Sequence, residues 1–114
     1  MAEVLGTDEF AAWFQALTYA EGKEVMNVVD KLEIMGLSLG HPHSSAIKNS
    51  KHGLRELRPK QGRSPIRVFY VFDPRRQAVL PIGGDKGEDK KLYERMVPIA
   101  ERILDEYLAE QTEQ

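Results

Sequence analysis

The stretch IRVFYVFDPRRQAVLPIGGDK, residues 66–86, decides the fold more clearly than any other part of the sequence. Its first residues alternate as a β-strand does, with Ile66, Val68, Tyr70 and Phe72 on one face and Arg67, Phe69 and Val71 on the other. Since both faces are largely apolar, we expect this strand to lie at the centre of a sheet.

The residues that follow predict a hairpin. Asp73 and Pro74 begin a turn, because proline suits the second position of a β-turn. Residues 78–84 then return as the antiparallel partner strand. Pro81 has no backbone N–H to donate to a ladder, so it indicates an edge position or a bulge within this second strand.

The N-terminal third is predicted to form a short strand and two helices. Residues 4–5 are a candidate strand, and Thr7 or Asp8 is a candidate helix cap. Apolar residues then recur at helical spacing in two groups, which Gly22 separates and Gly36 ends. The groups are Phe10, Trp13, Phe14 and Leu17, and then Val25, Val28, Val29, Leu32 and Met35. We therefore expect two antiparallel helices with their apolar side chains in the core.

The remaining segments complete the order of elements. Residues 37–53 are rich in Gly, Pro and Ser and predict a loop, whereas residues 54–58 (LRELR) predict a short strand. A final helix is expected over residues 89–110, where Pro98 should kink or restart it. Its predicted buried stripe contains Leu92, Met96, Ala100, Ile103 and Tyr107, with Val97, Leu104 and Leu108 beside it.

This order of elements predicts an α+β fold. We expect an N-terminal helical hairpin packed on a small, mainly antiparallel sheet, with a C-terminal helix. The length of 114 residues and the hydrophobic content of 41% indicate a single domain over residues 1–114. No apolar run reaches the roughly 18 residues that a membrane helix needs, and the N-terminus lacks the features of a signal peptide. We therefore expect a cytoplasmic protein without membrane association.

Metal and cofactor sites are not predicted. The chain has no cysteine, which excludes disulfides and thiolate metal sites. His41, His43 and His52 occur in the predicted loop, but no carboxylate joins them at the spacing of known metal ligands. We expect a function that requires neither a metal ion nor a cofactor.

Charge is distributed unevenly along the chain, although the net charge is only −2. Residues 1–36 carry a balance of −5, residues 51–76 a balance of +6, and residues 88–114 a balance of −4. A basic middle segment between acidic ends is compatible with a local phosphate-binding face. It is equally compatible with a solvated, arginine-rich sheet surface.

Four cationic residues lie on or near the predicted strands, and Arg67 is the most informative of them. The others are Arg55, Arg58 and Lys86. An arginine among the apolar residues of a central strand needs a partner. Arg67 could pair with Glu56 on the neighbouring strand, or it could reach the rim of the sheet and bind a phosphate bidentately. Lys86 follows Gly83 and Gly84, where the backbone permits close approach of a ligand.

Taken in order, these segments resemble one known family. The helical pair, LRELR at residues 54–58, residues 66–86 and the helix start EDKKLYERM at residues 88–96 resemble the RelE/ParE superfamily of bacterial toxins. The similarity is greatest to the HigB-like, phage-derived branch. It extends from about Val4 to Leu108 and is strongest over residues 54–97.

The resemblance implies the toxin of a type II toxin–antitoxin system. Such toxins are neutralised by a small cognate antitoxin, here expected to be a helix-turn-helix protein. Many free HigB and RelE toxins cut messenger RNA on the ribosome without a metal, through attack of a ribose 2′-oxygen on the adjacent phosphorus. The superfamily implies two alternatives, a ParE-like inhibitor of DNA gyrase and a degenerate toxin that acts only as antitoxin partner and co-repressor.

The resemblance also implies roles for individual residues. Arg67 matches a strand arginine that clamps phosphate, and Arg58 matches a second arginine of the site. Lys86 lies where relatives carry a basic or imidazole group that stabilises the transition state or transfers a proton. Tyr93 matches an aromatic residue that stacks on the base. Lys90 is implied to contact phosphate, and Arg55 is the further candidate for RNA binding.

Overall fold

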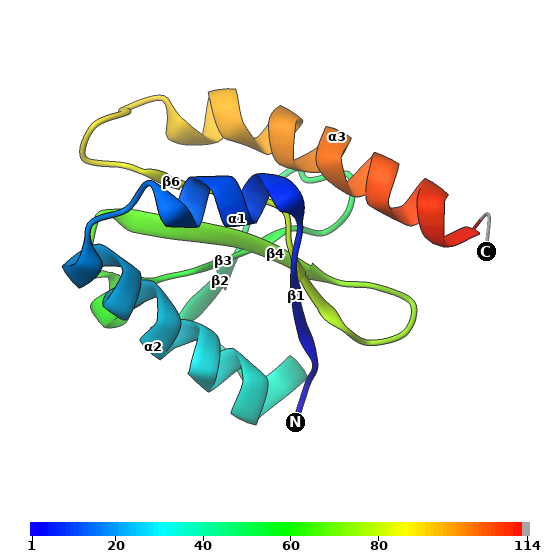
Figure 1. Cartoon of the computed structure of the whole chain (residues 1–114), viewed down its shortest axis with the longest axis horizontal. Helices are drawn as coiled ribbons and strands as arrows, with labels where there is room; N and C mark the ends of the chain where they lie inside the picture. Colours follow the sequence, from blue (N-terminus) through cyan, green and yellow to red (C-terminus); the bar gives the residue numbers. More distant parts are fainter. Residues whose placement is uncertain (113–114) are drawn as a thin grey trace.

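The computed structural model describes residues 1–112, which form one six-stranded sheet and three α-helices (Figure 1). The strands are β1 (Val4–Gly6), β2 (Ser44–Ala46), β3 (Arg55–Leu57), β4 (Ile66–Phe72), β5 (Ala78–Leu80) and β6 (Gly83–Asp85). The helices are α1 (Asp8–Gln15), α2 (Tyr19–Met35) and α3 (Leu92–Thr112), with 3₁₀ turns η1 (Gly36–Ser38) and η2 (Pro59–Gly62). The expected mixed α+β class is confirmed. No helix of this part of the chain has the length and apolar character needed to cross a bilayer.

The strand β4 lies at the centre of the sheet, as its alternating pattern predicted. It pairs antiparallel with β3, β5 and β6. The strand order is β1-β5-β4-β3-β2, and β6 pairs with β4 outside this path. The expected hairpin is therefore present, since Phe72 lies opposite Ala78 in an antiparallel ladder.

One strand pair departs from the expected antiparallel pattern. β1 and β5 are parallel, with Val4 opposite Ala78 and Gly6 opposite Leu80. At the end of β1, Thr7 donates its hydroxyl to the Pro81 carbonyl at 2.8 Å, which fixes β1 beside β5. The sequence of a three-residue strand carries no signal for this partner, because the pairing joins segments more than 70 residues apart.

The two faces of β4 belong to two different cores. Ile66, Val68 and Tyr70 pack with the buried side of α2, while α1 covers the margin of the same core. Phe69 and Val79 pack on the opposite face, against Leu92, Met96, Ala100 and Leu104 of α3. Figure 1 shows α3 on one side of the sheet and α2 on the other. The alternation of β4 therefore places Arg67 and Phe69 on the α3 side.

The connection between α1 and α2 differs from the prediction. Thr7 caps α1, accepting a hydrogen bond from Phe10 N at 3.1 Å. The expected break at Gly22 is wrong, because Thr18 and Glu21 form a capping box that starts α2 earlier and leaves Gly22 inside the helix. From this short connection the two helices diverge (Figure 1), so the expected antiparallel hairpin is not confirmed.

Three further boundaries differ from the prediction. The expected loop over residues 37–53 contains η1 and the strand β2, which β3 orders through antiparallel pairing. The expected single strand over residues 78–84 is divided into β5 and β6, because Pro81 interrupts it. The last helix begins at Leu92 rather than Asp89, and it continues through Pro98 without a restart.

We predict that Gly83→Ala destabilises the protein by about 1–3 kcal/mol, as overpacking of a filled core does. A Cβ atom at Gly83 would lie 2.4 Å from the nearest ring atom of Trp13. Urea unfolding of the two proteins measures the difference. Gly40→Ala is the matched control, because no atom lies within 4 Å of its added Cβ. An equal decrease in the free energy of unfolding in both variants would show that the contact with Trp13 does not require a glycine at position 83.

Candidate functional site

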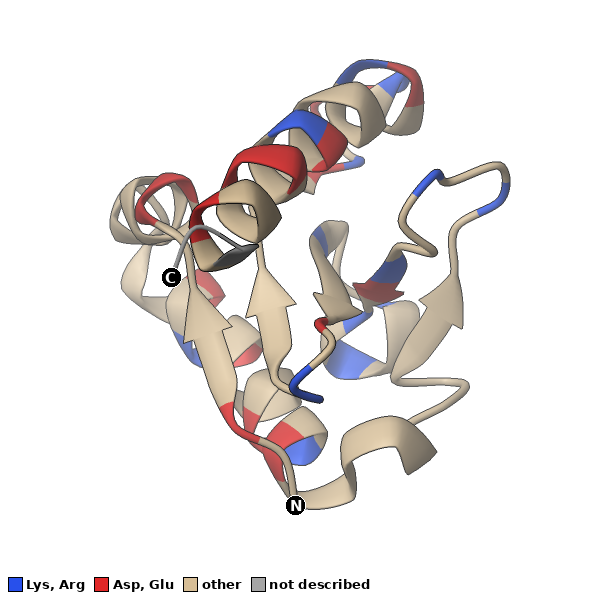
Figure 2. Ribbon diagram, turned by 90° about the vertical axis from the view of Figure 1, so that its right-hand side faces the viewer, with Lys and Arg blue, Asp and Glu red and all other residues tan. Residues whose placement is uncertain are grey.

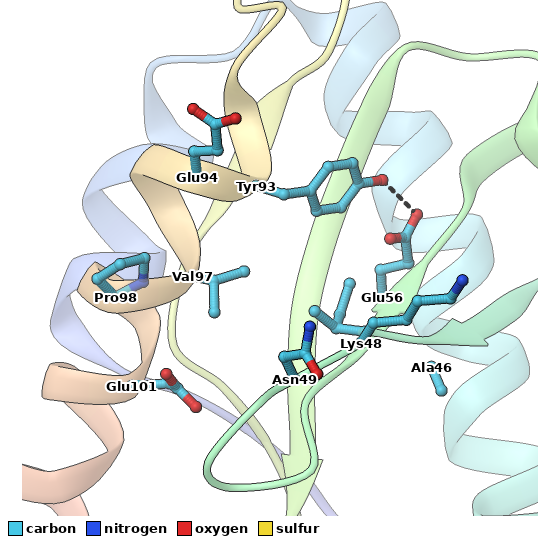
Figure 3. A pocket seen from close by; sticks show the side chains of 10 residues that line it. Ala46, Lys48, Asn49, Glu56, Tyr93, Glu94, Val97, Pro98 and Glu101 are labelled. Carbon is cyan, nitrogen blue, oxygen red and sulfur yellow. Dashed lines mark hydrogen bonds between the residues drawn. The ribbon is translucent and has the colours of Figure 1, made fainter.

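A pocket of about 620 Å³ lies between the N-terminal half of α3 and the loop after β2 (Figure 3). Figure 3 shows Tyr93, Val97 and Pro98 of α3 on one side and Glu56 of β3 on the other. Lys48 and Asn49 of the loop close a third side. The pocket thus joins the α3 face of the sheet to solvent.

A buried ion pair stands at the sheet side of this pocket. Arg67 Nε donates to Glu56 Oε1 at 3.0 Å, and the exposed fractions of the two side chains are only 5% and 8%. Arg67 Nη1 also donates to the carbonyls of Ser64 at 2.6 Å and Ile66 at 2.8 Å. Of the two arrangements considered for Arg67, the chain by itself adopts the pair with Glu56. The phosphate-binding role of Arg67 stays a prediction.

Tyr93 connects this ion pair to the first turn of α3. Its hydroxyl donates to Glu56 Oε1 at 2.8 Å (Figure 3), and its ring meets Phe69 edge to face with centroids 6.3 Å apart. Burial raises the pKa of Tyr93 to about 12, and the hydrogen bond to Glu56 and the charge of that carboxylate add to the increase. The phenol therefore stays protonated at neutral pH.

Lys86 lies over the outer face of the same tyrosine. Its Nζ is 5.2 Å from the centroid of the Tyr93 ring, within cation–π distance. Lys86 is exposed, and its backbone N–H donates to Pro65 O at 2.9 Å, which anchors the turn after β6 beside β4. The structure thus brings together three of the predicted residues, Arg67, Tyr93 and Lys86.

The other predicted residues lie outside this cluster. Arg55 lies on the opposite face of the sheet, where its Nε donates to Ser44 Oγ at 3.1 Å and Tyr70 Oη at 3.2 Å. Arg58 follows β3, and its guanidinium lies against Gly62, where an added Cβ would be 2.6 Å from Nη2. Lys90 is exposed in the turn before α3. The roles of these three residues in RNA contact stay predictions.

Gly83 and Gly84 are buried, and side chains of the protein itself lie over both of them. The close approach of a ligand beside Lys86 that these glycines are expected to permit stays a prediction. An added Cβ would lie 2.4 Å from Trp13 at Gly83 and 2.4 Å from Leu92 at Gly84. The glycines are therefore needed for α1 and α3 to approach β6 closely.

Sequence reasoning treated Glu56 only as a possible partner of Arg67, and it missed the loop that walls the pocket. Glu101 of α3 accepts hydrogen bonds from Ser50 Oγ at 3.0 Å, from His52 N at 3.3 Å and from Lys51 N. Asp105, one turn further, contacts His52 Nε2 at 2.7 Å and Lys51 Nζ at 3.1 Å. We call these contacts the loop clasp. The loop sequence KNSKH, residues 48–52, is polar and contains no pattern from which its contact with α3 could be predicted.

Electrostatics around the clasp agree with this geometry. The hydrogen bond from His52, followed by that from Lys51, holds the pKa of Asp105 below its usual value. Figure 2 shows acidic residues spaced along α3 and basic residues on the loops and short strands beside it. Within residues 1–112, no group of His, Asp and Glu side chains has the arrangement of a metal site.

Two solved structures have a similar fold. The chain is similar to a chain of the archaeal RelE–RelB complex from Pyrococcus horikoshii OT3, with a TM-score of 0.55, 16% identity and coverage of 75% of this chain and 96% of that one. It is also similar to HP0894 from Helicobacter pylori, with a TM-score of 0.52, 16% identity and coverage of 76% and 97%. The fold is therefore RelE-like.

Sequence similarity identifies the family. Residues 12–105 match the phage-derived protein Gp49-like family (DUF891). The chain is 39% identical over 99 residues to the putative toxin HigB3 of Mycobacterium tuberculosis, covering 85% of each protein. It is 33% identical over 106 residues to the putative toxin HigB2 of the same organism, covering 90% of this chain and 53% of HigB2. The chain belongs to the Gp49-like family and thereby to the RelE superfamily of toxins, as the resemblance predicted.

We predict that Arg67→Ala costs about 3–5 kcal/mol of stability, because it leaves the Glu56 carboxylate buried without its cationic partner. Thermal or urea unfolding measures this loss. The matched control is the double variant Arg67→Met with Glu56→Gln, which removes both charges and keeps an acceptor for Tyr93. It should recover most of the lost stability. An Arg67→Ala protein as stable as the wild type would show that the fold does not depend on the ion pair between Arg67 and Glu56.

We predict that ionisation of Tyr93 weakens the fold between about pH 10 and 12. The pKa of Tyr93 is raised from 10.0 to about 12 in the folded chain, so its contribution is complete below the unfolded value and is lost as the pH rises through the folded value. Urea unfolding over this pH range measures the effect. Tyr93→Phe should show a smaller decline, and equal declines in both proteins would contradict the assignment.

Proposed function

We propose that this RelE-superfamily toxin inhibits translation by cutting messenger RNA on the ribosome, and that a small cognate antitoxin neutralises it. The observation that carries the proposal is the cluster at the pocket, where a cation, a phenol and a carboxylate meet around Tyr93. The names of the relatives HigB3 and HigB2 support the toxin assignment. The RelE–RelB complex, one chain of which has a similar fold, supports an antitoxin partner.

The chemistry of RNA cleavage by 2′-oxygen attack fits these groups. The transition state gathers negative charge on the phosphorane, and a preorganised cation stabilises it. Lys86 supplies such a cation on the exposed side of Tyr93. Tyr93 offers a ring for base stacking and a phenol that remains a hydrogen-bond donor, since its pKa is about 12.

The leaving 5′-oxygen needs a proton, which the exposed ammonium of Lys86 supplies in this proposal. The attacking 2′-hydroxyl needs a proton acceptor. Glu56 is the carboxylate that lines the pocket in direct contact with Tyr93, and Oε1 already accepts from Tyr93 and Arg67. We propose that Glu56 takes this role. In this arrangement Arg67 acts as a positioning residue, because its guanidinium and the carbonyls of Ser64 and Ile66 fix the carboxylate.

We predict that production of the protein without an antitoxin arrests growth by stopping translation, with cuts in ribosome-bound messages. Lys86→Met should lower the cleavage rate by roughly 10²-fold, a loss comparable to removing one donor to a transition-state anion. Primer extension on ribosome-bound messenger RNA measures the cuts, and pulse labelling measures translation.

The matched control is Lys23→Met on α2. Lys23 also lies over a tyrosine, 5.6 Å from the centroid of the Tyr19 ring, but far along the chain from the pocket. This variant should remain fully active. Continued translation with loss of gyrase supercoiling would replace the proposal with the ParE-like function. Normal growth in the absence of antitoxin would favour a protein that acts only as an antitoxin partner.

A further inference from the structure

A second groove, separate from the Tyr93 pocket, runs along the outer edge of β6. It has a volume of about 670 Å³ and lies between α1 and α3, which flank β6 in Figure 1. Its apolar lining consists of Trp13, Ile82, Leu92, Met96 and Ile99. Its polar lining consists of Asp85, Glu88, Asp89 and Arg95. The groove is therefore apolar along its walls and acidic at one end.

The register of β6 turns backbone groups toward this groove. Phe69 N–H donates to Ile82 O at 3.0 Å, and Lys86 N–H donates to Pro65 O at 2.9 Å. Successive residues of an antiparallel strand direct their backbone groups to opposite sides. The backbone N–H and C=O of Gly84 consequently point toward Arg67, its partner on β4. The N–H and C=O of Gly83 and the N–H of Asp85 face the groove.

These three groups have no partner within residues 1–112. β1 covers the edge of β5 but ends at Gly6, opposite Leu80, so it does not reach β6. The Asp85 carbonyl, by contrast, accepts a hydrogen bond from Asp89 N at 3.0 Å. Gly83 is buried beneath Trp13, where an unpaired backbone group costs free energy. β6 therefore has an unpaired edge at the floor of the groove, and an unpaired sheet edge is a template for another strand.

We propose that the edge of β6 binds an extended segment of a partner protein as an additional strand. The strand hydrogen-bonds to Gly83 and Asp85, and its alternate side chains enter the apolar walls beside α1 and α3. Charge complementarity specifies the rest of its chemistry. The groove has three carboxylates against the single cation Arg95, whose Nε is already bound to Asp89 Oδ2 at 2.7 Å. The partner segment therefore carries Lys or Arg where it passes Asp85 and Glu88.

The experiment selects peptides from a phage-displayed library of random seven-residue sequences on the folded, full-length protein. We expect enrichment of sequences that alternate apolar residues with other residues and carry Lys or Arg. A synthetic peptide of the enriched sequence should shift the amide NMR resonances of Gly83 and Asp85. It should leave the resonances around Glu56 and Lys48 unchanged, because the Tyr93 pocket is not used.

Glu88→Lys tests the charge argument without disturbing the fold. Glu88 is exposed, and the structure assigns it only a backbone hydrogen bond, from its N–H to Asp85 Oδ1. This variant should bind the selected peptide roughly fivefold more weakly, as reversal of one exposed charge implies. Glu33→Lys, a charge reversal at another exposed position, on α2, should bind it as the wild type does.

Three results of the peptide experiments would overturn the proposal. They are a library that yields no binding peptide, a selected peptide that shifts resonances elsewhere, and a binding constant insensitive to Glu88→Lys. A concentration-dependent shift of Gly83 and Asp85 without peptide would also overturn it, because the groove would then hold a second copy of the chain. None of these outcomes depends on nuclease activity, so the proposal stands or fails separately from the proposed function.

Discussion

The buried ion pair between Arg67 and Glu56 is the constraint on which the site side of the molecule depends. Removing two charges from water is expensive, and the cost is offset only when every remaining donor and acceptor has a partner. The register that places Glu56 opposite Phe69 sets Arg67 diagonally beside it on the same face. Tyr93 then completes the arrangement from α3. One carboxylate oxygen thus ties together two strands and a helix.

The two faces of β4 pack against different helices and have different surroundings. The face of β4 that carries Val68 packs against α2 and α1 and forms one hydrophobic core with them. The face that carries Phe69 holds the ion pair and packs against α3, so the groups around Glu56 are held by strand positions. The β6 groove opens at a third place, the edge of the sheet between α1 and α3. A partner strand there would leave Glu56 untouched, which separates binding from chemistry in space.

The sequence predicted the elements whose signal is local, and it failed where structure depends on distant contacts. The alternation from Ile66 to Phe72 identified the central strand because each face has its own apolar set. Gly22 does not end a helix, because the capping box of Thr18 and Glu21, whose spacing is readable in the sequence, starts α2 before it. Nothing local could reveal β2, since Ser44–Ala46 is polar and becomes a strand only by pairing with β3. The choice between the two partners of Arg67 likewise needed the register and the burial that only the folded chain defines.

The loop clasp has a consequence for how the protein is made. The wall of the pocket, the Tyr93 hydroxyl and the carboxylates that hold residues 50–52 all depend on α3. Because α3 is the last of the described elements to be synthesised, a nascent chain with its sheet already formed still has no complete pocket. Assembly of the site therefore waits for this helix to emerge and dock. Until then, the nascent chain on the ribosome lacks the contact between Tyr93 and Glu56.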